Sequence, residues 1–171
     1  MTLGRGVPYC ERVQLYTPEQ RRRRDATKWT VVQAVLAPAQ FVAFLVSLVL
    51  VLRALWESDG YGAAAVSVVV KTGFLYVIMV TGAVWEKEVF GRYLFAPVFF
   101  WEDVFSMLVL ALHTAYLAAL FTGWLSPRAQ LLLALAAFAT YLVNATQFVL
   151  KLRAARLSAP ALELQPAGGG R

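Results

Sequence analysis

The sequence has little cysteine, histidine and charge, and each shortage excludes a class of protein. Of 171 residues only 15% are charged while 60% are hydrophobic, which is far too apolar for a water-soluble domain. The single Cys10 and the single histidine exclude a disulfide framework and a multi-ligand metal site. The sequence also has no Walker loop, no GxGxxG turn and no GxSxG elbow, so nucleotide-driven chemistry is not expected.

What the sequence does have is four long apolar runs. They cover residues 29–52, 61–85, 97–122 and 129–150. At about 1.5 Å per residue each run is long enough to cross the hydrocarbon core of a bilayer. Glycine and proline residues mark short connections between the runs. We therefore predict an all-α polytopic membrane protein, in which residues 29–153 form an antiparallel four-helix transmembrane bundle.

Two shorter segments flank this bundle. Residues 1–28 are predicted to be a cytoplasmic segment, too polar for a signal peptide, that contains a short interfacial helix. That helix begins at Thr17, which is followed by Pro18 and, at the third helical position, by Gln20, the pattern of a capping box. Residues 154–171 are rich in alanine, glycine and proline and are predicted to be a disordered cytoplasmic tail.

The orientation follows from the basic residues outside the predicted spans. Seven precede residue 29, two lie between the second and third spans and four follow residue 150, so that 13 lie on one side of the membrane against two on the other. The positive-inside rule puts the side with 13, and with it both termini, in the cytoplasm. The basic residues cluster at membrane edges, which indicates contact with anionic lipid and not with nucleic acid.

Each predicted helix carries one polar stripe of residues spaced by whole helical turns. Polar groups in a bilayer face a bundle interior, so four stripes predict one shared interior. Some of these side chains, including Gln40 and Ser47, need do no more than hold the helices together. The stripes consist of Thr30, Gln33, Gln40 and Ser47; Ser67, Lys71 and Glu86; Glu102, Ser106, His113 and Tyr116; and Thr140, Asn144, Gln147 and Lys151.

Two of these residues have alternative interpretations. Lys71 lies too deep in its span to reach the membrane surface and needs an anionic partner. That partner is either a carboxylate of the protein, Glu86 or Glu102, or an acidic group on a ligand. His113 is either a hydrogen-bonded interior residue or an axial ligand to the metal of a tetrapyrrole.

Acidic and aromatic residues gather at the cytoplasmic boundary. Glu86, Glu102 and Asp103 lie there beside Trp85 and Trp101. Carboxylates at a helix start suit the helix dipole, but crowded, partly buried carboxyl groups also make general acids usable near neutral pH. The connecting segment 89–100 is strongly aromatic and contains Arg92. It is either an interfacial anchor or a lid over a flat apolar ligand whose acid group pairs with the arginine.

Several segments resemble a known enzyme family closely. They are LYTPE at 15–19, WEKEVFGRYLFAP at 85–97, FWEDVFSM at 100–107, LHTAY at 112–116 and NATQF at 144–148. With them the sequence resembles the 3-vinyl (bacterio)chlorophyllide hydratases of bacteriochlorophyll biosynthesis, named 2-vinyl hydratases in older ring numbering. The resemblance runs from about residue 15 to residue 156 without an obvious gap.

The resemblance implies an enzyme, a hydro-lyase, that adds water to the C3 vinyl group of chlorophyllide a or bacteriochlorophyllide and gives a 3-(1-hydroxyethyl) group. It also implies the inner, intracytoplasmic photosynthetic membrane of a bacterium, with membrane lipid and other enzymes of the pathway as candidate partners. The reaction needs no redox cofactor, and we expect no cofactor. A membrane carrier or scaffold for tetrapyrrole pigments is the alternative, whereas a transporter has only the helix count in its favour.

The candidate site residues are inferred from the chemistry and not from the family. Hydration requires a carboxylic acid to protonate the terminal vinyl carbon and a second group to orient and deprotonate water. We expect Glu102 to be the acid, with Asp103 or Glu86 as its partner or as the water base. Substrate-binding candidates are Lys71 or Arg92 for the propionate, Asn144 and Gln147 for the water, and Ser106, Trp85 and Trp101 around the pigment, with His113 as a possible ligand to the substrate's magnesium.

Overall fold

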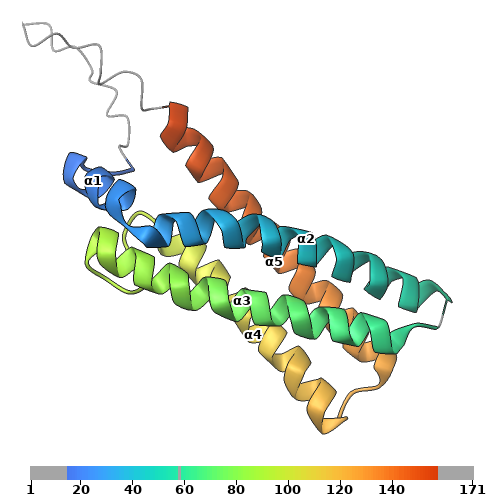
Figure 1. Ribbon diagram of the computed structural model, residues 1–171. Coiled ribbons are helices and arrows are strands. Elements are labelled where there is room, and N and C mark those ends of the chain that lie inside the picture. The colour runs from blue at the N-terminus through green and yellow to red at the C-terminus, as the bar shows by residue number, and fades with distance from the viewer. Residues whose placement is uncertain (1–14, 58, 158–171) are drawn as a thin grey trace, which may run out of the picture.

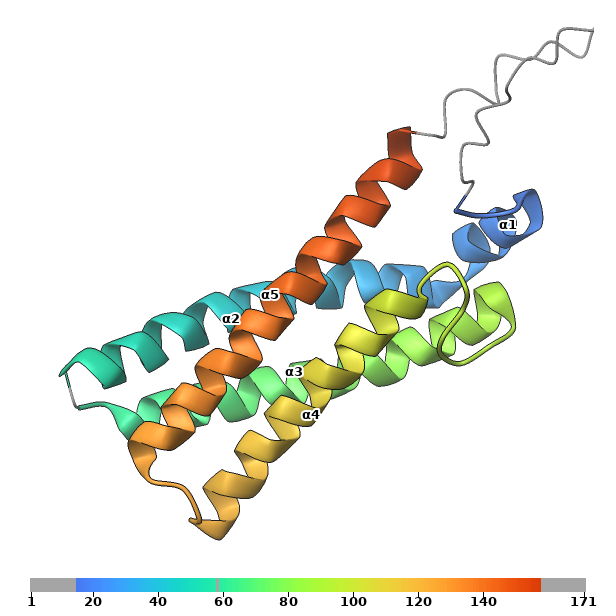
Figure 2. The same ribbon diagram turned by 180° about the vertical axis from the view of Figure 1, so that it is seen from behind.

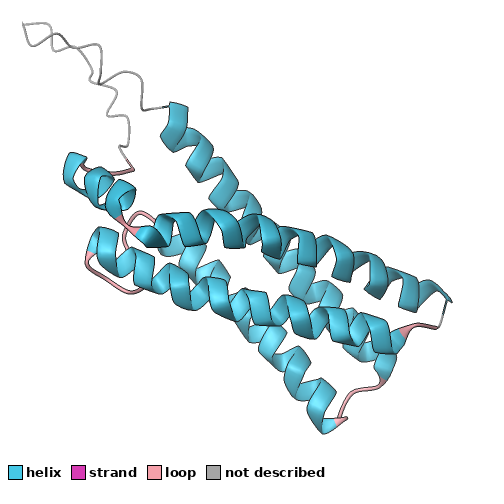
Figure 3. Cartoon of the chain, viewed as in Figure 1, coloured by secondary structure: helices cyan, strands magenta, loops and turns pink. Residues whose placement is uncertain are grey.

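The protein is an all-helical bundle of four long helices with one short helix at its N-terminal side. The computed structural model describes residues 15–57 and 59–157, with side chains up to residue 154. Its elements are α1 (Pro18–Ala26), α2 (Lys28–Glu57), α3 (Tyr61–Phe90), α4 (Phe100–Thr122) and α5 (Pro127–Leu157), shown in Figure 1. Every described residue outside them is in a loop or turn (Figure 3). The predicted all-α class is confirmed.

The four long helices are each long and apolar enough to cross a membrane. Large apolar side chains on their outward faces are exposed, among them Val35, Val80, Leu108 and Val149. Such a continuous apolar surface would be unstable in water but matches the hydrocarbon of a bilayer. The chain is therefore a membrane protein with four candidate spans.

The helices pack as two antiparallel pairs. α2 packs along α3 and α4 packs along α5, while α5 also crosses α2; Figures 1 and 2 show the second pair lying across the first. Interior contacts join the pairs, such as Phe44 of α2 against Phe138 of α5, whose ring centroids are 5.6 Å apart. α1, the C-terminal end of α3 and the loop of residues 91–99 lie at one end of the bundle.

The helix ends differ from the sequence prediction for local reasons. α2 continues beyond residue 52 to Glu57, where an ion pair of 2.7 Å from Arg53 to Glu57 supports the last turn. α3 continues to Phe90 and ends at Gly91, whose φ of 81° favours glycine. α4 begins at Phe100 and not at residue 97, because residues 97–99 form a turn.

The short helix begins as predicted. The Thr17 side chain accepts a hydrogen bond from the Gln20 amide and the Gln20 side chain accepts one from the Thr17 amide, which together form a capping box. The first half of the predicted N-terminal segment 1–28, residues 1–14, lies outside the described residues. α5 continues to Leu157, the fourth residue of the range predicted as a tail, and residues 158–171 lie outside the described residues.

Candidate active site

Three buried carboxyl groups lie together at the end of the bundle where α3 ends and α4 begins. We call Glu86, Glu102 and Asp103 the carboxyl cluster; they are only 6%, 7% and 3% exposed. Glu86 belongs to the last turns of α3, and the other two occupy the first turn of α4. The loop of residues 91–99 reverses the chain between the two helices and so brings the acids to one place.

Glu86 and Asp103 interact directly. Their carboxyl groups lie close enough to interact electrostatically. The loop holds each of them by a backbone amide: Phe95 N donates to Asp103 Oδ2 at 2.7 Å, and Ala96 N donates to Glu86 Oε2 at 3.4 Å. Two adjacent buried carboxylates repel each other, so a state in which one of them carries a proton is favoured. The pair is thus built to hold one proton.

Glu102 has a different partner. Its Oε2 lies 2.6 Å from Lys151 Nζ of α5. The same ammonium donates to the Val98 carbonyl and lies 4.9 Å from the centroid of the Phe99 ring. Since consecutive residues of a helix point about 100° apart, Glu102 faces α5 while Asp103 faces α3. Glu102 is therefore in an ion pair with a lysine, whereas the other two carboxyl groups lie close to each other and accept from the loop amides.

Amide and hydroxyl groups lie one helical turn from the cluster, toward the middle of the bundle. Asn144 Nδ2 donates to Ser106 Oγ at 2.8 Å. Ser106 follows Glu102 by one turn of α4, and Gln147 precedes Lys151 by one turn of α5. Within the described part of the chain, the buried oxygens Asn144 Oδ1 and Gln147 Oε1 have no hydrogen-bond donor. Two buried acceptors without donors near an acid are suited to bind a water molecule.

Aromatic side chains cover the cluster. Phe99 contacts Trp85, Phe90 and Phe148 with ring centroids 5.9, 5.7 and 6.0 Å away. Tyr16, just before α1, stacks on Phe90 at 5.8 Å. These rings exclude bulk water from that side of the carboxyl groups, which strengthens electrostatic interactions there.

The three remaining aromatic and basic candidates at this end of the bundle differ in exposure. Trp85 is half-buried and donates from Nε1 to Thr30 Oγ1 at 2.9 Å. Trp101, on the neighbouring helix, is 68% exposed, and Arg92 in the loop is also exposed. Trp101 and Arg92 are therefore accessible from outside the bundle. Trp101 directly precedes Glu102, and Arg92 lies in the loop six residues after Glu86.

Lys71 and His113 form a separate pair deep in the bundle. Lys71 lies 15 residues before Glu86 on α3, a separation of about 22 Å along a helix, so it is not part of the carboxyl cluster. Its Nζ lies 2.8 Å from His113 Nε2, and His113 Nδ1 lies 2.8 Å from the Val109 carbonyl. The neighbour of the lysine is therefore an imidazole and not Glu86 or Glu102, and both ring nitrogens of His113 are engaged.

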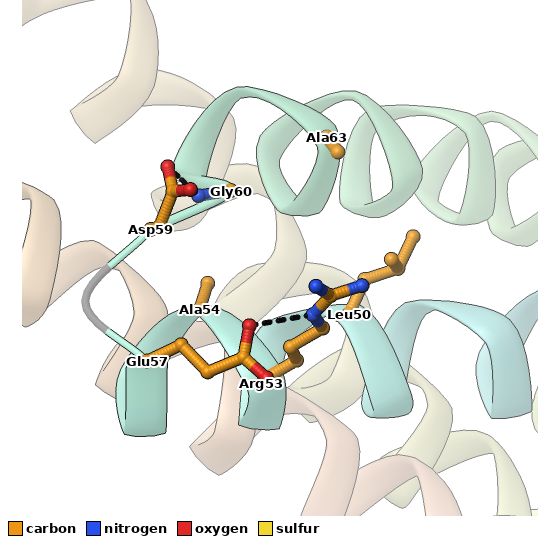
Figure 4. Close-up of a pocket in the computed structure, with 7 residues that line it drawn as sticks. All are labelled: Leu50, Arg53, Ala54, Glu57, Asp59, Gly60 and Ala63. Carbon is orange, nitrogen blue, oxygen red and sulfur yellow. Dashed lines mark hydrogen bonds and ion pairs between the residues drawn. The ribbon is translucent and has the colours of Figure 1, made fainter.

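A small pocket lies at the opposite end of the bundle. It has a volume of about 160 Å³ and lies in the α2–α3 hairpin, where Arg53, Glu57 and Asp59 line it (Figure 4). Ligand pockets for molecules of drug size start at about 300 Å³. This pocket is thus too small for a large flat pigment, and none of the candidate site residues lines it.

Comparison with known proteins identifies the family. A model of the family "2-vinyl bacteriochlorophyllide hydratase (BCHF)" matches residues 16–154. The chain belongs to this family. A 2-vinyl bacteriochlorophyllide hydratase of Rhodobacter capsulatus is 66% identical over 148 residues, 86% of each chain. One of Cereibacter sphaeroides is 60% identical over 157 residues, which cover 91% of this chain and 97% of that protein.

The family match contains the whole candidate site. The segment 16–154 includes the carboxyl cluster, Lys151 and the aromatic cover. No solved structure matches the chain, so the geometry given above comes from this hydratase-family member alone.

Sequence reasoning found the three acids but missed their partners. The loop amides of Phe95 and Ala96 carry no side-chain signal, and nothing in the sequence marks them as donors. Lys151 was recognised as a member of the polar stripe of the last span and as a basic residue at the membrane edge, but not as a partner of Glu102. Its spacing of one and two turns from Gln147 and Asn144 was the available signal.

Proposed function

We propose that this protein is a hydratase that adds water to the vinyl group of bacteriochlorophyllide or chlorophyllide a. The product carries a 3-(1-hydroxyethyl) group, and the reaction belongs to bacteriochlorophyll biosynthesis. Membership in the family supports the substrate class. The observation that carries the chemistry is the buried, amide-held Glu86–Asp103 pair, in which a single proton is favoured. The site would operate at the cytoplasmic face of a bacterial photosynthetic membrane.

Glu86 is the proton donor in this proposal. The amide bond to Asp103 is 2.7 Å long and that to Glu86 is 3.4 Å, so negative charge is better stabilised on Asp103. The shared proton therefore resides on Glu86, which delivers it to the terminal vinyl carbon. The resulting cation is next to the macrocycle, which delocalises it. Sequence reasoning assigned the acid role to Glu102, but its ion pair with Lys151 suits a carboxylate that orients other groups.

Water attacks the inner carbon in the second step. The Asn144 and Gln147 oxygens without donors accept hydrogen bonds from this water and hold it one turn below the acids. Asp103 takes the proton that the water loses as the C–O bond forms. The carboxyl pair has then given one proton and received one, so the cycle closes with a net addition of water and no change of oxidation state.

The pigment is held from the outer side of the site. Arg92 pairs with its propionate, and Trp101 provides an exposed aromatic face for the ring. Lys71 was the other candidate for the propionate, but its ammonium lies on His113 between the helices. Removal of Arg92 (R92A) should therefore raise KM for the pigment, whereas K71M should leave KM near the wild-type value.

Four single variants test the acid assignment. Membranes that contain each variant receive chlorophyllide a, and product is followed by the blue shift of the red absorption band and by a mass gain of about 18 Da, the mass of water. We expect E86Q and D103N to lose about a hundredfold or more in kcat, as is typical when a general acid or base is removed. E102Q should retain more activity than either of them.

Glu88 provides the matched control. It lies in the same stretch of α3, but it is exposed and accepts a hydrogen bond from Thr27. E88Q should turn over at the wild-type rate. Wild-type turnover by E86Q would overturn the assignment of the acid, and pigment binding by the wild-type protein without any gain in mass would support a carrier instead.

A further inference from the structure

Phe95 has an unusual backbone conformation for its residue type. Its φ is 59°, and it is the one non-glycine residue with positive φ in the part of the chain that the structure describes. In this left-handed region the Cβ atom of an L-residue crowds its own backbone, so glycine, asparagine and aspartate occupy it far more readily than an aromatic residue does. A strained residue of this kind persists only where its surroundings hold it.

Packing of the Phe95 side chain does not account for the strain. The ring is 39% exposed and its recorded ring contact is with Phe100, at a centroid distance of 5.8 Å. The free-energy gain from burying this ring is therefore incomplete. The backbone, in contrast, is fully used: the Phe95 amide donates to Asp103 at 2.7 Å, and the next amide, that of Ala96, donates to Glu86.

The left-handed turn is what lets two consecutive amides point to the same place. Successive N–H groups diverge in an extended chain, whereas a left-handed residue within a turn makes them converge on one negatively charged group. Here the target is the carboxyl pair of Glu86 and Asp103, and Ala96 at the centre of this arrangement is fully buried. The shorter of the two bonds belongs to Phe95, so the conformation of this one residue determines which carboxyl group is better stabilised.

We propose that Phe95 is a positioning residue whose left-handed backbone, and not its ring, keeps the shared proton on Glu86. This inference rests on the proposed function, in which Glu86 is the acid. If φ of residue 95 moved to the negative region, the amide would turn away from Asp103. The proton would then move to Asp103, and the acid would be misplaced relative to the vinyl group.

A substitution series at residue 95 separates backbone from ring. F95G and F95N accept a positive φ without the ring, and F95V resists it because its side chain is β-branched. F100A is the matched control, since it removes the same ring–ring contact and leaves the loop backbone unchanged. We expect kcat of F95G, F95N and F100A to stay within about threefold of the wild type, and kcat of F95V to fall about tenfold or more, as for the loss of a hydrogen bond to a charged group.

Infrared spectroscopy of the substrate-free protein gives a readout independent of turnover. The wild type should show a protonated-carboxyl band that E86Q removes. In F95V the proton should lie on Asp103 and not on Glu86. The band should therefore be absent from the double variant F95V/D103N and present in F95V/E86Q. F95G and F100A should keep the wild-type assignment.

The outcomes distinguish this inference from the proposed function. Equal kcat and an unchanged band in F95G and F95V would overturn it, as would a rise in KM common to every variant that lacks the ring. If F95V does not accumulate in the membrane, the kcat values of F95G, F95N and F95A test the inference instead. A role of the backbone requires F95A to have the lowest kcat of the three, because alanine adopts a positive φ less readily than glycine or asparagine. If E86Q and D103N are fully active while the band still moves in F95V, the acid assignment fails and the positioning role stands.

Discussion

Lys71 Nζ of α3 donates to His113 Nε2 of α4 across 2.8 Å in the middle of the bundle, where both side chains are fully buried. The Val109 carbonyl can only accept a hydrogen bond, so His113 Nδ1 carries the hydrogen and Nε2 is the acceptor. The Tyr141 ring lies 4.2 Å from the same ammonium. Each member of this pair thus provides the hydrogen-bond partner that the other one needs inside an apolar bundle.

This mutual dependence predicts strong coupling between the two residues. K71M leaves the imidazole acceptor without a donor, and H113F leaves the lysine without its acceptor. Each change should destabilise the protein by about 1–3 kcal/mol. The double variant K71M/H113F removes both polar groups and leaves neither without a partner. Its loss of unfolding free energy should therefore be clearly smaller than the sum of the losses in the two single variants. Unfolding in mixed micelles measures all four proteins, and simple additivity would contradict the prediction.

Alkaline pH should weaken the packing of the N-terminal segment. Burial raises the pKa of Tyr16, although the nearby Arg24 opposes this shift. The unfolded chain loses the phenolic proton near its ordinary value of about 10, and the folded chain loses it only at higher pH. The contribution of Tyr16 to stability is therefore complete below about pH 10 and is lost as the pH rises through the folded-state pKa.

The Y16F variant tests this assignment. It keeps the ring that stacks on Phe90 at 5.8 Å and removes the group that titrates. Thermal unfolding measured between neutral and strongly alkaline pH should show a shallower loss of stability in Y16F than in the wild type. Y93F is the matched control, because Tyr93 lies at the same end of the bundle but is 60% exposed; a flattened profile in Y93F instead would argue against the role of Tyr16.

Trp101 should contribute to pigment binding and not to the chemical step. It is 68% exposed and lies next to the carboxyl cluster. Loss of an aromatic contact worth about 1 kcal/mol should raise KM about fivefold in W101A and leave kcat unchanged. Trp124, which is 66% exposed after the other end of α4, is the matched control, and W124A should leave both constants unchanged. Equal effects of the two variants would mean that neither tryptophan contacts the pigment specifically.

Much of the fold was predictable because hydropathy and helical periodicity are local signals. The four spans and the inward-facing acids follow from runs of apolar residues and from spacing along a helix. The ends of the helices were less predictable. Glu86 was expected at the boundary of the second span, but α3 continues to Phe90 because its last turns pack on the loop and on α1 instead of meeting water.

The pairing within the site was not predictable, because it depends on the loop and on the rotation of α4. Glu102 and Asp103 are adjacent in the sequence, yet one pairs with Lys151 and the other with Glu86. A rotation of about 100° separates their directions, so the rotation of α4 about its own axis, which the sequence pattern does not fix, decides which acid faces α3 and which faces α5. The left-handed Phe95 that fixes Asp103 has no local signature, since phenylalanine does not favour this conformation.

The orientation of the bundle in the membrane is open to a direct test with the single cysteine. Four spans put both termini on the same side, and the excess of basic residues predicts that this side is the cytoplasm. Cys10 lies outside the described residues but precedes α1 in the sequence. A membrane-impermeant maleimide should therefore label Cys10 in inverted vesicles and not in spheroplasts. The control C10S/S126C moves the thiol to the exposed α4–α5 connection and should give the opposite pattern; labelling of Cys10 in spheroplasts would reverse the orientation and place the carboxyl cluster at the outer face.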